Sequence, residues 1–257
     1  MNFLRNAAAA TLLTTFLTLA LPTATLAAEG GAKLAPQNWS FSGPFGTFDR
    51  AAAQRGFQVY SEVCAACHTV KQAYYRDLKG IGLDAKEIEA IAAAVTIAVI
   101  GDDGQPSERP GQPSDHFRAP YPNEKAARAA FNGAYPPDLS VIIKARAGGA
   151  DQMYGLLVGY VDAPADMKMG DGMYYNKYFA GHQIAMPSPL SDGRVTYADG
   201  TRASVEQMSR DLTTFLAYIA EPEMEARKRL GVKVVLFLIF MTGITYAVKR
   251  KVWADVH

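Results

Sequence analysis

The chain has 257 residues, of which 49% are apolar and 20% charged, a composition that excludes a disordered protein. A formal net charge of +1 argues against a nucleic-acid-binding protein, because proteins of that class carry a basic excess. Two cysteines exclude a disulfide-dense scaffold and a four-cysteine metal site.

Acidic and basic residues are unevenly distributed along the chain. Residues 29–226 hold 18 Lys or Arg and 24 Asp or Glu, a net charge of −6. All eight remaining basic residues lie beside two apolar stretches, as in a membrane protein. The first stretch, residues 7–21, follows Arg5 and leads to small residues at 27 and 28, which is typical of a secretory signal peptide. We predict that residues 1–28 are cleaved; the alternative is an uncleaved anchor.

Residues 29–226 are then an exported domain, in which the pattern predicts helices separated by Gly- and Pro-rich loops. We expect a mainly α fold with many irregular connections. Five prolines and three glycines between residues 101 and 122 predict a loop, and the only strand-like piece is residues 194–197. Helices are expected over residues 50–63, from 84 with apolar spacing as far as 99, over 123–131, over 139–147 and from 204 to 219.

The second apolar stretch, residues 231–248, has Lys233 as its only charged residue. At about 1.5 Å per residue it spans roughly 27 Å, close to the thickness of a bilayer core. We predict a charged lead-in and transmembrane anchor over residues 227–248, followed by a short cytoplasmic tail, residues 249–257. Basic residues 227–229 also precede the stretch, so the positive-inside rule alone does not orient it, and the predicted signal peptide decides the orientation. The alternative is a buried helix of a soluble core.

The strongest chemical signal is Cys64-Ala65-Ala66-Cys67-His68. Two thiols separated by two residues and followed at once by His are typical of covalent haem c attachment, with His68 as an axial iron ligand. A zinc site would need a second Cys/His cluster, which the sequence lacks. A thioredoxin-like redox pair needs a βαβ context, and a disulfide across so short a loop would be strained.

The residues alone leave the sixth iron ligand open. Met186 is the preferred candidate, because Pro187 and Pro189 would hold its apolar loop rigid, and a thioether favours ferrous iron. Arg146 or Arg118 is a candidate partner for a haem propionate, since guanidinium groups bind carboxylates in a bidentate way. The other candidates for the sixth position are His116, His182 and the methionines at 153, 167, 169, 173, 208 and 224.

Together these segments resemble the cytochrome c1 family, the haem c subunit of the bacterial type of quinol–cytochrome c oxidoreductase (cytochrome bc1 complex, complex III). The resemblance covers nearly the whole mature chain. It is carried by Trp39-Ser40-Phe41-Ser42-Gly43-Pro44-Phe45-Gly46, Arg55-Gly56-Phe57-Gln58-Val59-Tyr60 with the haem motif, Pro136-Pro137-Asp138-Leu139-Ser140, Lys144-Ala145-Arg146-Ala147-Gly148-Gly149, Ile184-Ala185-Met186-Pro187 and Glu221-Pro222-Glu223.

The resemblance implies a class I cytochrome c-like haem domain with irregular loop insertions and one C-terminal transmembrane helix. It implies one covalent haem c on Cys64 and Cys67, axial ligands His68 and Met186, a propionate contact from Arg146, and haem-edge packing by Pro136 and Pro137. The extra cysteine pair that some bacterial relatives carry is absent here.

The implied function is one-electron transfer from a Rieske iron–sulfur protein to a cytochrome c, beside a cytochrome b subunit in the bilayer, with no nucleic-acid partner. The chain alone is then an electron carrier, and the enzyme is the whole oxidoreductase. We expect a single-pass protein of the bacterial inner membrane with its haem domain in the periplasm. The alternatives are a haem c subunit of a terminal oxidase or nitrogen-oxide reductase, and a haem-based sensor.

Overall fold

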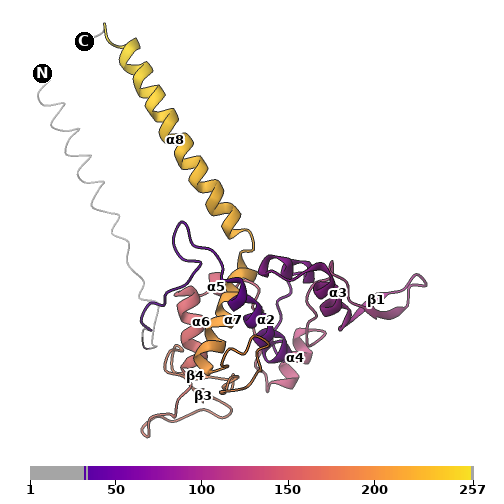
Figure 1. Cartoon of the computed structure of the whole chain (residues 1–257). Coiled ribbons are helices and arrows are strands. Elements are labelled where there is room, and N and C mark those ends of the chain that lie inside the picture. Colours follow the sequence, from indigo (N-terminus) through magenta and orange to yellow (C-terminus); the bar gives the residue numbers. More distant parts are fainter. Residues whose placement is uncertain (1–31, 33, 256–257) are drawn as a thin grey trace, which may run out of the picture. The chain divides into compact units, whose positions relative to one another are not determined.

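The computed structural model describes residue 32 and residues 34–255, so the predicted signal peptide lies outside the described residues. The described part is mainly helical, with few short strands (Figure 1). Its elements are α2 (Arg50–Glu62), η1 (Cys64–Ala66), η2 (Tyr75–Ile81), α3 (Ala85–Ala93), β1 (Thr96–Ile100), β2 (Pro106–Pro110), α4 (Glu124–Ala130), α5 (Ile142–Ala145), α6 (Gly149–Val158), β3 (Tyr174–Tyr175), β4 (Gln183–Ile184), α7 (Val205–Ala220) and α8 (Met224–Val252).

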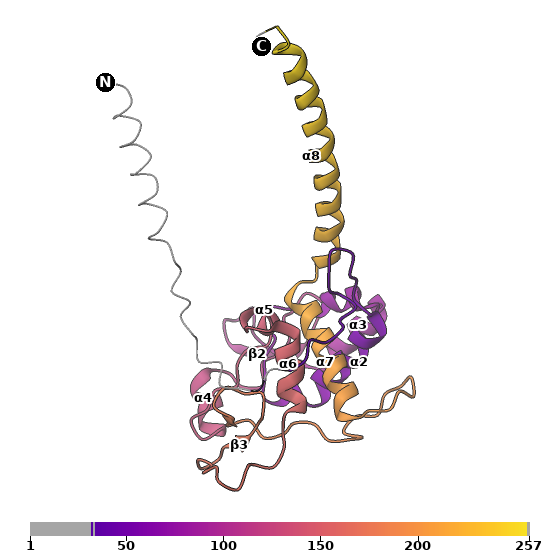
Figure 2. The same ribbon diagram turned by 90° about the vertical axis from the view of Figure 1, so that its left-hand side faces the viewer.

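The core of the domain is built around α7, which packs against α2, α5 and α6 (Figures 1 and 2). Helix α7 begins where the Ser204 hydroxyl accepts a hydrogen bond from the Gln207 amide, a standard N-cap. Gly56 allows α2 to approach closely, because a Cβ at this position would lie 2.0 Å from the Asp211 carbonyl oxygen. Helix α2 ends against this core and leads directly into the haem motif.

A buried ion pair also joins α2 to α7. The Arg55 guanidinium donates to both carboxylate oxygens of Asp211, at 2.9 and 3.0 Å, and Asp211 is fully buried. A third hydrogen bond of 2.9 Å runs from Arg55 to Asp199, in the loop after the Met186 segment. Gln58 of α2 donates to the Thr196 carbonyl of the same loop. Helix α2 therefore carries the haem motif at its end and also holds the chain that follows Met186.

Three expectations about local structure are wrong in whole or in part. The helical spacing that continues to Val99 ends at Ala93, and Val99 lies in an antiparallel hairpin of β1 and β2. This hairpin occupies part of the predicted loop, since Pro106 and Pro110 stand at the two ends of β2, where few ladder bonds are lost. Among the described residues 191–200 there is no strand, so the expected strand at 194–197 is absent.

The helix expected over residues 139–147 is also shorter than predicted, and a neighbour was missed. Helix α5 covers only Ile142–Ala145, and α6 starts at the glycine pair that was expected to end it. Gly148 has a positive φ of 84°, so the chain turns there and a second helix begins at once. Apolar side chains of α6, among them Met153 and Leu157, are buried in the core.

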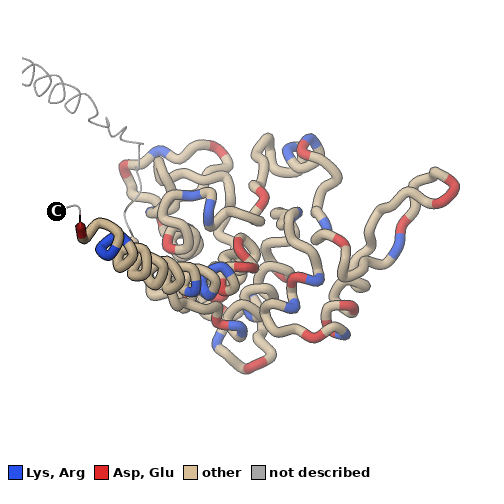
Figure 3. Tube along the Cα trace, turned by 90° about the horizontal axis from the view of Figure 1, so that it is seen from above, with Lys and Arg blue, Asp and Glu red and all other residues tan. Residues whose placement is uncertain are grey.

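Helix α8 has 29 residues and is long and apolar enough to cross a membrane. Its side chains from Leu230 onward are largely exposed within the described chain. Lys and Arg stand near both of its ends with an uncharged stretch between them (Figure 3). The predicted anchor, residues 231–248, lies wholly inside this helix, which begins earlier than the apolar stretch because the charged lead-in is helical too.

Candidate haem c site

The haem motif forms a tight turn at the end of α2. The amides of Cys67 and His68 both donate to the Cys64 carbonyl, at 3.0 and 2.8 Å, which bends the backbone around the two thiols. Cys64 is buried at 8% exposure, and Cys67 is half-buried. Because the turn is short, two sulphur atoms and the imidazole are presented from five consecutive residues, which fits two thioether bonds and one axial ligand from the same segment.

The environment of the thiols argues against the rival interpretations of the motif. Burial, with a smaller contribution from Cys67, raises the pKa of Cys64 to about 12, and burial also raises the pKa of Cys67. A catalytic redox pair needs a lowered thiol pKa. Among the residues that the structure describes, no group of three or more His, Cys, Asp or Glu side chains is placed to hold a metal ion. Neither a thioredoxin-like pair nor a zinc site is supported.

The His68 ring is oriented by a backbone carbonyl. Its Nδ1 lies 2.8 Å from the Pro137 carbonyl oxygen, so we assign the Nδ1–H tautomer that donates to it. Burial lowers the pKa of His68 and favours the neutral ring. A neutral imidazole bonded through Nδ1 presents its Nε2 lone pair, which is the state and geometry of an axial haem ligand.

Sequence reasoning missed a carboxylate that holds this arrangement together. Asp138 Oδ2 accepts hydrogen bonds from the Thr69 hydroxyl and from the Lys71 amide, and Oδ1 accepts from the Ser140 amide. Leu139 adds a backbone bond of 2.7 Å to the Thr69 carbonyl. The Pro-Pro segment is thereby fastened to the residues after His68. An Asp two residues before Ser, a local pattern of Asx turns, was the available signal.

Partial burial opposes ionisation of the Asp138 carboxyl, yet its hydrogen bonds outweigh that effect. The bonds from Ser140, Thr69 and Lys71 hold the pKa of Asp138 below its ordinary value. The carboxylate is therefore charged at neutral pH, and its bonds are of the stronger, charge-assisted kind. Pro136 is half-buried and Pro137 exposed beside this fastened segment.

Met186 lies in the loop that follows β4 and is half-buried. Its carbonyl accepts a 3.0 Å hydrogen bond from the Tyr160 hydroxyl, and burial raises the pKa of that phenol, which keeps it a donor. Leu190, just beyond the two prolines, is buried in the core. The backbone on both sides of Met186 is thus held, as an axial-ligand loop requires.

Most of the rival candidates have other roles in the structure. Met153, Met208 and Met224 belong to the hydrophobic core. The ring of His116 is exposed and lies 3.8 Å from the ring of Tyr74. His182 adopts a positive φ of 59°, stacks on Tyr175, and its Nδ1 lies 3.3 Å from the Asn176 carbonyl. Unlike His116, His182 is half-buried and lies only four residues before Met186, so it is the main competitor of Met186. Met167, Met169 and Met173 are half-buried in the preceding loop.

The two candidate arginines lie in different surroundings. Arg146 is exposed at the C-cap of α5, in the segment between the fastened prolines and α6. Arg118 borders a cavity of about 540 Å³ together with Ala65 of the haem motif and the rings of Tyr60 and Phe117. Both residues are exposed, so an anionic group can reach either of them.

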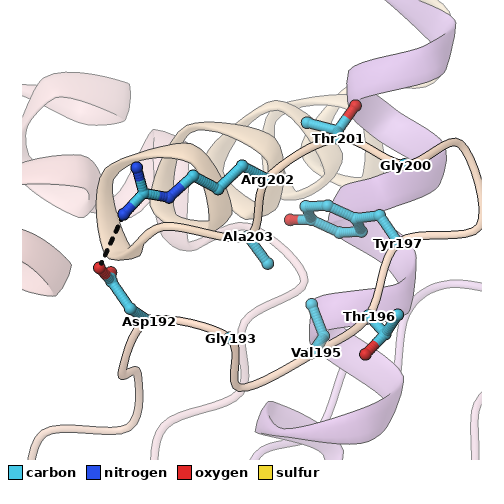
Figure 4. A pocket seen from close by; sticks show the side chains of 9 residues that line it. All are labelled: Asp192, Gly193, Val195, Thr196, Tyr197, Gly200, Thr201, Arg202 and Ala203. Atoms are coloured by element: carbon cyan, nitrogen blue, oxygen red, sulfur yellow. Dashed lines mark ion pairs between the residues drawn. The ribbon is translucent and has the colours of Figure 1, made fainter.

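A second hollow lies in the loop that follows the Met186 segment (Figure 4). It is lined by residues of 192–203, with Asp192 and Arg202 in a 3.7 Å ion pair at one side. Tyr197 is buried, and Arg55 of α2 lies over its ring at 5.8 Å from the centroid. The residues of this hollow carry no predicted role; the contact with Arg55 shows instead how α2 supports this loop.

The model of the cytochrome c1 family matches residues 39–256, nearly all of the part that the structure describes. The chain belongs to the cytochrome c1 family. Proteins of this family carry covalently bound haem c, so the cofactor is haem c. The Cys-x-x-Cys-His segment has the spacing that haem c attachment needs and is the candidate site. The family also confirms the expected mainly helical haem domain and the electron-carrier class.

Curated relatives support this assignment. The chain is 44% identical to cytochrome c1 of Rhodospirillum rubrum, covering 93% of this chain and 94% of that protein. It is 47% identical to the mitochondrial cytochrome c1 haem protein of Saccharomyces cerevisiae, over 90% of this chain and 75% of the other. It is 48% identical to the cytochrome b/c1 protein of Bradyrhizobium diazoefficiens, over 89% of this chain but only 37% of that longer protein.

Proposed function

We propose that this chain is the cytochrome c1 subunit of a quinol–cytochrome c oxidoreductase and passes single electrons from a Rieske iron–sulfur protein to a cytochrome c. The observation that carries this proposal is the His68 imidazole, held through Nδ1 by the Pro137 carbonyl at the end of a Cys-x-x-Cys-His turn. A relative from Candida albicans, 45% identical over 90% of this chain, is named a cytochrome b-c1 complex catalytic subunit.

When bound, haem c supplies a one-electron couple between ferrous and ferric iron. Cys64 and Cys67 would attach it, while His68 and Met186 would hold the iron from its two faces. Because His68 and Met186 would both ligate the iron, no position would be left for a substrate, which favours electron transfer over oxygen chemistry. Arg146 would face a propionate, and Pro136 with Pro137 would cover the haem edge.

The proposed membrane topology follows from the uneven distribution of charged residues along the chain. Residues 1–28 would direct export and be removed, residues 29–226 would lie in the periplasm, and residues 227–248 would enter and cross the inner membrane. Residues 249–257, with three consecutive basic side chains, would remain in the cytoplasm. A cytochrome b subunit would then neighbour α8 within the bilayer.

Purification in mild detergent tests the proposal directly. We expect cytochrome b and a Rieske protein to co-purify, and rapid mixing with a quinol to reduce the haem of this chain before added cytochrome c. Co-purification with oxidase or nitrogen-oxide reductase subunits would favour the alternative assignment. Carbon monoxide binding to the reduced protein would instead reveal a vacant sixth position and favour a sensor.

A further inference from the structure

The loop of residues 40–47 is bonded to the first turns of α8. The Lys228 ammonium donates hydrogen bonds to the carbonyl oxygens of Phe41 and Gly46, at 2.6 and 3.2 Å. These two carbonyls lie near the two ends of the loop, so the Lys228 ammonium bridges those ends. Lys228 belongs to the basic run that immediately precedes the apolar stretch of α8.

The base of the same loop has a second attachment to α8. The Phe48 amide donates to Glu225 Oε1 at 2.8 Å, and Glu225 also pairs with Arg50 at 2.9 Å. The Phe41 ring packs against Trp39 and Phe48, with ring centroids 5.5 and 5.4 Å apart. Three hydrogen bonds therefore join the loop and its base to α8, while aromatic packing orders the loop itself. Both views show the loop beside the start of α8 (Figures 1 and 2).

The tip of the loop presents a bare aromatic ring. Phe45 is 80% exposed, whereas its neighbours Phe41 and Phe48 are half-buried and buried. Gly43, with φ of 72°, turns the backbone, and Pro44 stiffens the approach to Phe45. One exposed apolar side chain is ordinary on a soluble surface. What distinguishes Phe45 is its position relative to α8.

Phe45 precedes Gly46, whose carbonyl is bonded to Lys228, just before the apolar stretch of α8 begins. Lys228 precedes Gly231, the first residue of the apolar stretch, by only three residues, which is about 4.5 Å along a helix. Leu230 is already 62% exposed, and Arg227 and Arg229 flank Lys228. Lys and Arg side chains near the end of a membrane-spanning helix extend to the interface, and Trp or Tyr rings gather there. Phe side chains of interfacial segments are buried at the boundary between headgroups and acyl chains.

We propose that the loop of residues 40–47 is a second membrane contact, in which the Phe45 ring inserts among the headgroups of the phospholipid bilayer beside α8. The inference rests on the proposed crossing of the membrane by α8. Two contact points, the helix and the loop, would restrict the tilt of the haem domain over the bilayer. The haem would then face its donor and acceptor in a limited range of orientations.

Nitroxide labelling of the haem-loaded full chain in phosphatidylcholine–phosphatidylglycerol vesicles tests this. The haem takes both native thiols, so a cysteine introduced by Phe45→Cys is the single labelling site. We expect a several-fold higher ratio of oxygen to nickel-chelate collisions at position 45 than for Ile100→Cys, whose side chain is 70% exposed on the β1–β2 hairpin. Equal ratios at the two positions would overturn the proposal.

A third label separates this proposal from the anchor on which it rests. Ile239→Cys, 64% exposed in the middle of α8, reports whether the helix lies in lipid. Lipid exposure at 239 with water exposure at 45 overturns only the loop contact, whereas water exposure at 239 overturns the anchor as well. In the assembled complex, protection of position 45 from both reagents would indicate a protein partner and also contradict insertion. Unchanged covalent haem absorbance verifies folding of each variant.

Discussion

Chemically similar side chains acquire different roles in this chain through their surroundings. Met208 is fully buried on α7, while Met186 is half-buried in a loop whose backbone Tyr160 holds. A thioether in a helix core serves packing, and one on an irregular loop is able to approach an iron. The same contrast separates His68, whose Nδ1 donates to a fastened carbonyl, from His116, which stacks on a tyrosine.

Replacing Met186 by Lys should lower the haem midpoint potential while covalent attachment survives. A thioether favours ferrous iron, and axial ligands tune haem potentials over roughly 0.8 V, so we expect a fall on the order of 0.2 V. At about 59 mV per decade this shifts the equilibrium by more than about 10³-fold. Redox titration measures it, and quinol-dependent turnover should collapse.

The matched control is Met208→Leu, which changes the core without touching the proposed site. It should cost less than about 1.5 kcal/mol of unfolding free energy and leave the potential unchanged. An unchanged potential in Met186→Lys would identify another sixth ligand, with His182 first among the candidates.

Replacing Asp138 by Ala should loosen the carbonyl that orients His68. Three hydrogen bonds to a charged acceptor are lost, and the donors of Thr69, Lys71 and Ser140 lose their partner. A cost of about 1–3 kcal/mol is expected in denaturant unfolding, together with a shifted potential. Asp162→Ala, at an exposed position, is the control and should change neither quantity. A variant indistinguishable from that control would show that the Pro137 carbonyl needs no such support.

At the scale of elements, helix α2 supports both the haem motif and the loop that follows Met186. Its C-terminal end leads into the haem motif, and Arg55 and Gln58 bond the loop that follows Met186. Asp211 on α7 anchors Arg55 from the buried side. The segments that carry the two proposed axial ligands are therefore supported by one helix.

Replacing Arg55 by Met should be among the most damaging changes in the domain. It leaves the Asp211 carboxylate buried without its main partner, which costs about 3–5 kcal/mol in comparable buried pairs. Arg55→Lys keeps the charge but loses the bidentate geometry, so an intermediate loss is expected. Denaturant unfolding in detergent measures both.

Arg202→Met provides the comparison for Arg55. The Arg202–Asp192 pair is exposed and lies in the same loop, so its loss should cost less than about 1 kcal/mol. Similar losses at positions 55 and 202 would mean that the buried pair adds nothing beyond an ordinary surface contact.

For the whole molecule, charge separates the domain from its anchor. Residues 29–226 carry a net charge of −6, while basic residues flank the apolar stretch of α8 (Figure 3). An acidic surface favours encounter with a basic electron acceptor and also keeps a domain soluble. The two explanations differ in their salt dependence.

The rate of electron transfer to a basic cytochrome c should fall as ionic strength rises. Charges on the surface interact over about 8–10 Å at physiological salt and over shorter distances at higher salt. Stopped-flow mixing over a range of salt concentrations measures the bimolecular rate. The control is a neutral small-molecule oxidant, whose rate should stay flat. A flat rate with the cytochrome as well would leave solubility as the role of the acidic excess.

The sequence by itself determined what depends on neighbouring residues. The spacing within residues 64–68 indicates haem c, since the chemistry needs two thiols and an imidazole from one short turn. The caps at Asp49, Asp84 and Ser204 begin helices where predicted, because a side-chain oxygen and an amide two or three residues away form the bond. The apolar stretch of residues 231–248, in which Lys233 is the only charged residue, likewise predicts a helix long enough to cross a membrane, and α8 is such a helix.

Only the tertiary structure decided what joins distant segments. The Pro137 carbonyl on His68 is 69 residues away in the chain, Asp211 is 156 residues from Arg55, and Lys228 is 187 residues from Phe41. No local pattern encodes such partners. The β1–β2 hairpin was missed for a different reason: its strands are neighbours in the chain, but the prolines of β2 indicate a loop when each residue is considered alone. A polar side chain such as Arg55 or Lys228 stabilises the fold only because the folded backbone brings a distant partner within hydrogen-bond distance.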